Sequence, residues 1–420
     1  MSLITSSHFA SACAGGTDWR EAAKNVLEQL NDTQTDKGYF NFGFLYISDH
    51  LADDTSSILN LFKSVLNVDH WVGSVGMGIV GGTQSMIDTP AISAMICRLP
   101  EDSFCIFPPD DEFDEHEDED SSHATAHDSI YEWTRRNMPL LTITHGDPLS
   151  EHDLLADLSD LEKETNSFII GGMASSRNAH YQIADTVREN MLSGALFSDA
   201  VNVATTLSQG CEPISDFHTV TKADEATILE LNDRLAIDVF QDDLRRTEAK
   251  KQNVDTTQFT TDLKAIEFSD KIPAEFQNLF HAQVHIARPL LHSDQKDYMV
   301  RNINRLNADE GSISISEPIS VGDRILFVER NENSLVTDLS RSLVALRKRI
   351  QSEKGEFSPK AALYISCVAR GMGPSFPDEK NEIDLIREII GPIPMTGFYA
   401  GGEINNAQLY GFTGILTLFF

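Results

Sequence analysis

Short apolar runs alternate with amphipathic segments along most of this chain of 420 residues. A run that is apolar at both odd and even positions predicts a buried strand, and apolar residues three and four apart predict a helix. The clearest strands are expected at Phe42–Ile47, His70–Val72, Ala91–Leu99, Leu140–Thr144, Phe168–Ile170 and Leu363–Ser366. The clearest helices are expected from Thr17, from Asp53, over Glu151–Glu164 and over Ser334–Ser352. Strands that alternate with helices predict the α/β class.

The pattern is interrupted at Gln209–Ser215, a Gly/Pro corner, and begins afresh from Thr219. We therefore expect two mixed α/β domains, residues 1–215 and 216–420. In the second domain, strands are expected at Val284–Arg288, Tyr298–Ile303, Ile313–Ile315 and Arg324–Arg330.

Residues 108–128 differ from the rest because Asp and Glu dominate them. Like charges at this density repel one another and cannot pack, which predicts an exposed or disordered acidic insertion in the first domain. Two interpretations of His116, His123 and His127 within it stay open: a loosely bound metal ion or a solvated acidic loop. A docking segment for a partner is a further interpretation.

Three segments of the chain repeat one order of elements: strand, small polar residue, helix, strand, glycine. The first strands of these units are Leu45–Ser48, Leu141–Thr144 and Leu363–Ser366, and the first and third both read Leu-Tyr-Ile-Ser. If each unit is a right-handed crossover, its two strands are parallel. The loops after both strands then lie at the carboxyl edge of the sheet, where open α/β sheets bind ligands. Glycine-rich turns at these edges are therefore the predicted binding surface.

Arg370 and Glu403 lie in two such loops of the third unit. A guanidinium holds a carboxylate and a carboxylate accepts an ammonium, so the pair would suit an amino-acid-like zwitterion. An ordinary salt bridge, or two unrelated surface charges, is the alternative. The other expected ligand-binding residues are Ser74, Gly76, Gly171, Gly371, Tyr399 and Gly402.

Charge and cysteine usage exclude several classes of function. The net charge of −32 argues against nucleic acid and against anionic lipid surfaces. No apolar run approaches a membrane span, and Met1–Gly16 has no secretory pattern. The five cysteines form no Cys-x-x-Cys pair, so neither a zinc ribbon nor a redox dithiol is indicated. A cytoplasmic location is expected.

Signals of common enzyme classes are absent from the sequence. Gly76–Gly81 spells the dinucleotide fingerprint, but a β-like run follows it where the fingerprint requires a helix. No P-loop, Gly-x-Ser-x-Gly or His-Glu-x-x-His pattern occurs. An enzyme of unassigned chemistry is therefore the least supported hypothesis.

Several motifs resemble those of the FIST family. Leu207–Ile214 followed by Val220–Ala223 resembles the junction of the family's N and C domains, and Tyr298–Asn302 resembles the middle of the second. Ser366–Gly371 and Gly397–Ile404 resemble its closing motifs. The chain departs from the family at Ala369, where a glycine is usual, and at Ile79, where the first glycine turn usually carries an acid.

The resemblance implies a sensory protein that binds a small ligand, with amino acids proposed as ligands, and that signals through a protein partner. No cofactor is expected on this interpretation. Some members resemble haem-based nitric-oxide sensors, so a haem sensor is the alternative. His145, His180 and His285 are the histidines in ordered context that could ligate haem or a metal.

Overall fold

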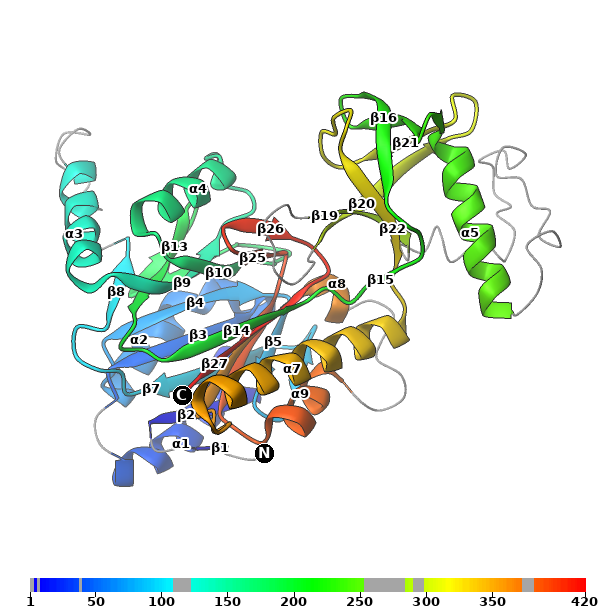
Figure 1. Cartoon of the computed structure of the whole chain (residues 1–420). Coiled ribbons are helices and arrows are strands. Elements are labelled where there is room, and N and C mark those ends of the chain that lie inside the picture. The colour runs from blue at the N-terminus through cyan, green and yellow to red at the C-terminus, as the bar shows by residue number, and fades with distance from the viewer. Residues whose placement is uncertain are drawn as a thin grey trace. The chain divides into compact units, whose positions relative to one another are not determined.

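The structure is a computed structural model that describes residues 4–5, 8–37, 40–108, 122–252, 284–289, 298–371 and 381–420. The chain forms two compact units, one from Met1–Gln209 and Leu339–Phe420 and the other from Gly210–Asp338 (Figure 1). The first unit takes in the end of the chain because the last strands pair with strands of the amino-terminal part. The division into domains 1–215 and 216–420 stays a prediction.

Three parallel strand pairs form the centre of the first unit. They are β3 (Phe42–Ser48) with β4 (His70–Gly76), β9 (Pro139–Gly146) with β10 (Phe168–Met173), and β23 (Ala361–Cys367) with β24 (Met395–Ala400). Along the chain, the two strands of each pair are separated by a helix: α2 (Thr55–Leu66), α4 (Leu154–Thr165) and α9 (Glu382–Ile390), respectively. The parallel pairing predicted for the three repeated units is confirmed, and so is the mixed α/β class.

Each pair lies in a separate sheet. The strand orders are β1-β2-β7-β3-β4-β11-β12, β26-β25-β10-β9-β13-β8 and β14-β27-β23-β24-β5-β6. The remaining strands of these sheets are β1 (Ile4–Thr5), β2 (Phe9–Gly15), β5 (Gly78–Gly81), β6 (Ser85–Ile87), β7 (Ala91–Cys97), β8 (Phe104–Phe107), β11 (Gln182–Ala184), β12 (Thr186–Arg188), β13 (Leu192–Ser198), β14 (Val203–Ser208), β25 (Gly402–Asn405), β26 (Gln408–Tyr410) and β27 (Gly414–Phe419).

The three strand–helix–strand segments, called repeats from here on, exchange strands in a cycle. After β4 the chain enters β5, which pairs antiparallel with β24 of the third repeat. After β24 it enters β25, which pairs with β10 of the second repeat. After β10 it enters β11, which pairs with β4 of the first repeat. Each repeat therefore completes the sheet of another, and the carboxyl ends of the parallel strands are tied together.

In each of the three repeats one glycine lies where two parallel strands approach closely: Gly73, Gly171 and Gly397. A Cβ atom at each would lie 1.7 Å from a carbonyl oxygen of the neighbouring parallel strand. Each glycine is also paired with an aliphatic residue of the exchanged strand, Ile183, Ile404 and Val80, respectively. A side chain cannot fit at this distance, so these glycines are required by the close approach of the strands.

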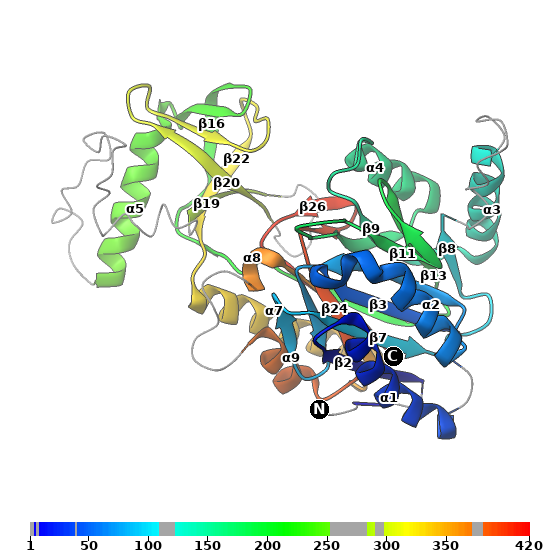
Figure 2. The ribbon, with the colours of Figure 1, turned by 180° about the vertical axis from the view of Figure 1, so that it is seen from behind.

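The inner faces of the three sheets share one apolar core, which includes Phe44, Tyr46, Ile143, Ile365 and Phe398. Helices cover the outer faces: α1 (Trp19–Lys37) and α2 on the first sheet, α4 on the second, and α7 (Glu332–Lys354) with α9 on the third (Figures 1 and 2). Apolar residues on both sides of a strand explain why the sequence shows runs instead of alternation. Among the described helices, none is long and apolar enough to cross a membrane.

Six strands of the second unit close into an antiparallel barrel, in the order β16 (His218–Asp224), β17 (Thr227–Leu231), β21 (Ser312–Ile315), β20 (Tyr298–Asn307), β19 (Val284–Pro289) and β22 (Arg324–Glu329). The pairing of β22 with both β19 and β16 closes the ring. Two short strands outside the ring, β15 (Glu212–Pro213) and β18 (Arg234–Leu235), pair with β22 and β17, respectively. Helix α5 (Ala236–Gln252) adds Val239 and Phe240 to the barrel core.

Strand β2 and helix α3 are among the elements that differ from the sequence predictions. Strand β2 was not expected, because its Ala- and Ser-rich sequence gives little apolar signal. Helix α3 (Ser122–Asn137) begins inside the acidic insertion expected at 108–128, since the dense run of acids ends before Ser122. Residues 109–121 and the side chains of His116, His123 and His127 lie outside what the structure describes.

Candidate functional site

The carboxyl ends of the three parallel pairs meet at Ser175, which is buried just after β10. Its hydroxyl accepts a hydrogen bond from the Met77 backbone N–H at 2.9 Å and donates one to the Tyr399 carbonyl at 2.5 Å. Its own N–H donates to the Val75 carbonyl at 3.3 Å. One serine of the second repeat, Ser175, therefore holds the ends of β4 and β24. The sequence predicted that the two loops of each repeat share one sheet edge, but it did not predict that the edges of the three repeats meet.

The connection after β10 is longer than its counterparts in the other two units. Only Met77 separates β4 from β5, and only Gly401 separates β24 from β25. Residues 174–181 separate β10 from β11 and include Arg177. The extra chain leaves the repeated framework at the shared edge, and loops at such edges are where binding residues concentrate.

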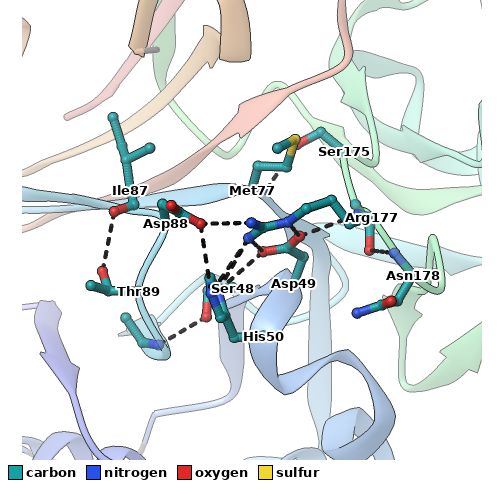
Figure 3. A network of polar contacts seen from close by, with 12 residues as sticks. Ser48, Asp49, His50, Met77, Ile87, Asp88, Thr89, Ser175, Arg177 and Asn178 are labelled. Atoms are coloured by element: carbon teal, nitrogen blue, oxygen red, sulfur yellow. Dashed lines mark hydrogen bonds and ion pairs between the residues drawn. The ribbon is translucent and has the colours of Figure 1, made fainter.

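Arg177 points from this loop toward Asp49, at the carboxyl end of β3 in the first repeat (Figure 3). Its Nε and Nη2 atoms donate to the two carboxylate oxygens of Asp49 at 2.7 and 2.9 Å, and its backbone N–H donates to the same carboxylate at 3.2 Å. Asp49 directly follows β3, and only 1% of its side chain is exposed. The fork-to-carboxylate geometry fixes the orientation of the guanidinium.

The remaining guanidinium nitrogen of Arg177 faces a more exposed group. Nη1 donates to Asp88 at 2.7 Å, and the side chains of Asp88 and Arg177 are 56% and 46% exposed. His50 lies beside them, with Nδ1 3.3 Å from Asp49 and Nε2 3.6 Å from Asp88. Figure 3 shows Asp49, His50 and Asp88 arranged around the guanidinium. The arginine thus has one buried and one accessible carboxylate partner.

The electrostatics of this cluster follow from the same contacts. Burial by itself would raise the pKa of Asp49, but the hydrogen bonds and positive charge of Arg177 outweigh it and lower the pKa below its usual value. Asp49, followed by Asp88, raises the pKa of Arg177 further above its ordinary range. Asp49 and Arg177 are therefore both charged at neutral pH.

Two of the predicted ligand residues lie inside strands. Ser74 is fully buried in β4, where its hydroxyl donates to the Val75 carbonyl at 3.2 Å. Gly171 was expected to follow the end of its strand, but β10 continues to Met173. Gly171 lies in close contact with the backbone of Thr144 in β9. The observed contacts of both residues are therefore within the sheets, and a ligand role for either stays a prediction.

Two other predicted residues, Gly76 and Gly371, lie beside a third, the buried Tyr399. A Cβ atom at Gly371 would lie 2.7 Å from this ring, and one at Gly76 would lie 3.2 Å from the Tyr399 carbonyl. Burial raises the pKa of Tyr399 well above its usual value. Gly402 opens β25 and pairs with Met173. These glycines make room for close packing at the shared edge.

Arg370, on the short helix α8 (Val368–Gly371), forms an enclosed ion pair. Its Nε and Nη2 atoms lie 2.6 and 2.5 Å from one oxygen of Glu382, and the two side chains are 0% and 4% exposed. Ser366 donates to the other Glu382 oxygen at 2.7 Å, and Nη1 of Arg370 donates to the Ser208 carbonyl at 3.0 Å. Arg370 is therefore in a salt bridge with Glu382, which was not predicted, and not with Glu403. A ligand role for Arg370 stays a prediction.

Glu403 is fully buried in β25. One carboxylate oxygen accepts the Thr413 N–H at 2.9 Å and the Thr413 hydroxyl at 2.7 Å, and the thiol of Cys367 lies beside the group. Burial raises the pKa of Glu403 to about 7, against the opposing effect of the Thr413 hydrogen bonds. Arg370 and Glu403 contact the adjacent residues Phe412 and Thr413, so they hold one turn from two sides.

Two of the three histidines considered for haem are enclosed by protein. His145 is fully buried in β9, its Nε2 lies 3.1 Å from the Tyr46 hydroxyl, and burial lowers its pKa to about 3. The ring packs against Tyr46 and Phe398, so a haem does not fit there. His285 is 1% exposed. His180, in the 174–181 loop, is partly exposed, and haem binding through it stays a prediction.

Within the described ranges, no three His, Cys, Asp or Glu side chains gather in a way that could hold a metal ion. The sequence reasoning passed over Asp49, Asp88, Ser175 and Arg177. One signal could have found them: the second repeat has more residues between its glycine and its next strand than the other two repeats.

Two known family domains match this chain. The FIST N domain matches residues 41–234, and the FIST C domain matches residues 236–406. The chain belongs to the FIST family. FIST domains are in general sensory domains that bind small ligands. The resemblance inferred from the sequence motifs is confirmed.

One relative matches this FIST protein over most of its length and another over about half, both at low identity. An uncharacterized protein of Mycobacterium tuberculosis is 24% identical over 380 residues, which cover 88% of each chain. An uncharacterized protein of Mycobacterium bovis is 27% identical over 217 residues, or 51% of this chain and 49% of its own.

Proposed function

We propose that this FIST protein is a cytoplasmic sensor that binds an amino-acid-like zwitterion at the shared carboxyl edge and signals through a separate protein partner. The observation that carries the proposal is the 174–181 loop, which presents Arg177 between the buried Asp49 and the exposed Asp88. Binding is favoured over catalysis because an accessible guanidinium beside an accessible carboxylate matches the two charges of a zwitterion.

A zwitterion matches the two halves of this cluster. Its carboxylate would take the Nη1 side of Arg177, where Asp88 now accepts a hydrogen bond at 2.7 Å. Its ammonium would then lie against Asp88, which the exchange releases. Asp49 would stay bonded to the other guanidinium nitrogens and hold Arg177 in place. The ligand thus replaces an ion pair that the protein makes with itself, which limits the desolvation cost.

Arg177 and Asp88 replace Arg370 and Glu403 as the proposed anchors because of exposure. The Arg370 guanidinium is enclosed by Glu382 and Ser208, and Glu403 is bonded to Thr413. A ligand would have to break these buried contacts before it could use either group, at a cost of several kcal/mol. The accessible pair requires no such rearrangement.

A thermal-shift panel of the twenty common amino acids tests the proposal, followed by calorimetry of each amino acid that raises the melting temperature. For such an amino acid, the matched amine without the carboxylate and the matched acid without the ammonium should bind about tenfold more weakly or less. Equal binding of the amine would rule out Arg177 as the carboxylate anchor.

Asp88→Asn is the decisive variant, because Asp88 is exposed and the variant should fold normally. It should weaken binding of the amino acid about tenfold. Asp160→Asn is the matched control, since Asp160 is also an exposed aspartate in an ion pair, with Lys163 at 2.8 Å. The proposal fails if no amino acid binds, or if both variants bind as the wild type does.

A further inference from the structure

A concave site lies at the opposite ends of the parallel strands from the shared carboxyl edge. A cavity of about 570 Å³ opens beside the starts of β3 and β23, where Cys97 pairs with Phe42 and Phe419 pairs with Ala361. The chain segments around it are 8–9, 98–101, 200–202, 360 and 419–420. Its volume is in the range typical of small-molecule sites, roughly 300–1,000 Å³.

The charged groups of this cavity are mostly basic, although the chain as a whole has a net charge of −32. His8, Arg98 and Lys360 line it, with Glu101 as the one carboxylate side chain among the lining residues. The Arg98 guanidinium is exposed and makes no hydrogen bond or ion pair with any residue that the structure describes. Among the described residues, the Lys360 ammonium donates only to the Ser358 carbonyl, at 3.5 Å. Two cations are therefore available to a ligand.

The rest of the lining is apolar and partly aromatic. Phe9 and Phe419, whose ring centroids are 5.6 Å apart, form part of the wall together with Leu99 and Val201. These four residues belong to the core or its margin and are fixed by packing. Aromatic and aliphatic walls favour a flat apolar body, while the cations favour a negative charge at its end.

We propose that this cavity binds a small organic anion in which a carboxylate is attached to a flat apolar body. Arg98 holds the carboxylate with its guanidinium fork, and Lys360 adds a second positive charge. Glu101 is a single carboxylate without the arginine-paired arrangement of Asp88, so the site selects an acid over a zwitterion. It is separate from the shared carboxyl edge and independent of the amino-acid proposal.

Calorimetry with 2-naphthoate as the probe tests this site in the full chain. Binding is expected for 2-naphthoate, with about tenfold weaker binding or less for 2-naphthylmethylamine, which carries the opposite charge, and for acetate, which lacks the apolar body. Equal binding of the amine, or no binding of 2-naphthoate at millimolar concentration, would overturn the proposal.

Two variants locate the binding. Arg98→Gln should weaken 2-naphthoate about tenfold, and Lys360→Gln should weaken it by a smaller factor, because a lysine contributes a point charge where arginine contributes a fork. Lys163→Gln, at an exposed lysine of α4, is the control and should bind as the wild type does. The Arg98 guanidinium makes no hydrogen bond or ion pair with a described residue, and the backbone bond from the Arg98 N–H to the His8 carbonyl is kept in the variant, so Arg98→Gln should fold. Unchanged affinity in Arg98→Gln would place the ligand elsewhere.

Discussion

Two arginine–carboxylate clusters at the carboxyl edges of the first unit use the same chemistry for different ends. Arg370 and Glu382 are both enclosed, and every described contact of the pair is made within the chain. Arg177 is bonded to a buried aspartate on one side and to an exposed aspartate on the other. The difference indicates that exposure, and the mix of partners, separates a pair that maintains the fold from one that can exchange a partner for a ligand.

The largest effect is expected from Arg370→Met. The variant leaves the Glu382 carboxylate buried with only the Ser366 hydroxyl as a described partner. Loss of one member of a buried ion pair typically costs about 4 kcal/mol of unfolding free energy. Chemical denaturation measures this, with Arg347→Met as the control, since Arg347 is exposed and donates to the Ile389 carbonyl.

The double variant Arg370→Met/Glu382→Leu sharpens this prediction. Removal of both charges should recover much of the lost stability, because no ion is then left without its partner. If the single and double variants are equally destabilised, the loss comes from packing at α8 and not from the unpaired carboxylate.

The next effect is a pH dependence at Glu403. Burial raises its pKa from 4.5 to about 7 in the folded protein. Between these pH values the unfolded chain releases the proton while the folded protein keeps it, so the stabilising contribution is present at low pH and lost as the pH rises. The loss approaches about 3 kcal/mol above pH 7.

Glu403→Gln isolates this contribution, because its amide oxygen can still accept from Thr413 and carries no proton equilibrium. The unfolding free energy of the variant relative to the wild type should increase from pH 4 to pH 8. A constant difference across this range would show that the pKa of Glu403 is the same in the folded and unfolded states, which contradicts the prediction.

Arg177→Gln should have a smaller effect on stability than Arg370→Met. It removes the partner of the buried Asp49, but water reaches the arginine side of the contact. We expect a loss of about 2 kcal/mol near neutral pH. Because Arg177 holds the pKa of Asp49 low, this contribution disappears as the pH falls through the usual carboxylate range, opposite in direction to Glu403.

The control for this variant is Arg234→Gln in the second unit. Arg234 pairs with Asp242 at 2.7 Å, and both side chains are exposed. A loss of about 0.5 kcal/mol or less is expected there. Equal losses for the two arginines would mean that the burial of Asp49 carries no stability.

The repeated units were predictable from the sequence because their signals are local. Apolar runs, a following small residue and a glycine marked each strand, and the parallel pairing followed from the intervening helix. The cyclic exchange of β5, β25 and β11 was not, since these strands are short and pair with partners far along the chain. The closure of the barrel in the second unit was hidden for the same reason.

Charge at the predicted loops was also visible, whereas burial was not. Arg370 follows a strand as a binding arginine would, but its partner Glu382 begins a helix, and only the fold brings the two together. Arg177 ends a run of small residues, a pattern that by itself does not indicate a binding site. Its distinction is the longer connection after β10, which emerges only when the three units are compared.

The smallest stability effect is expected from Asp88→Asn, and it provides the sharpest contrast with Arg370→Met. Asp88 is exposed and bonds one arginine nitrogen, while Asp49 keeps the rest of the guanidinium in place. The unfolding free energy should change by about 0.5 kcal/mol or less, as for other exposed ion pairs. A loss comparable to that of Arg370→Met would mean that Asp88 is needed for the fold and cannot be released to a ligand. A small loss would leave the accessible side of Arg177 free to exchange partners, which the enclosed Arg370 cannot do.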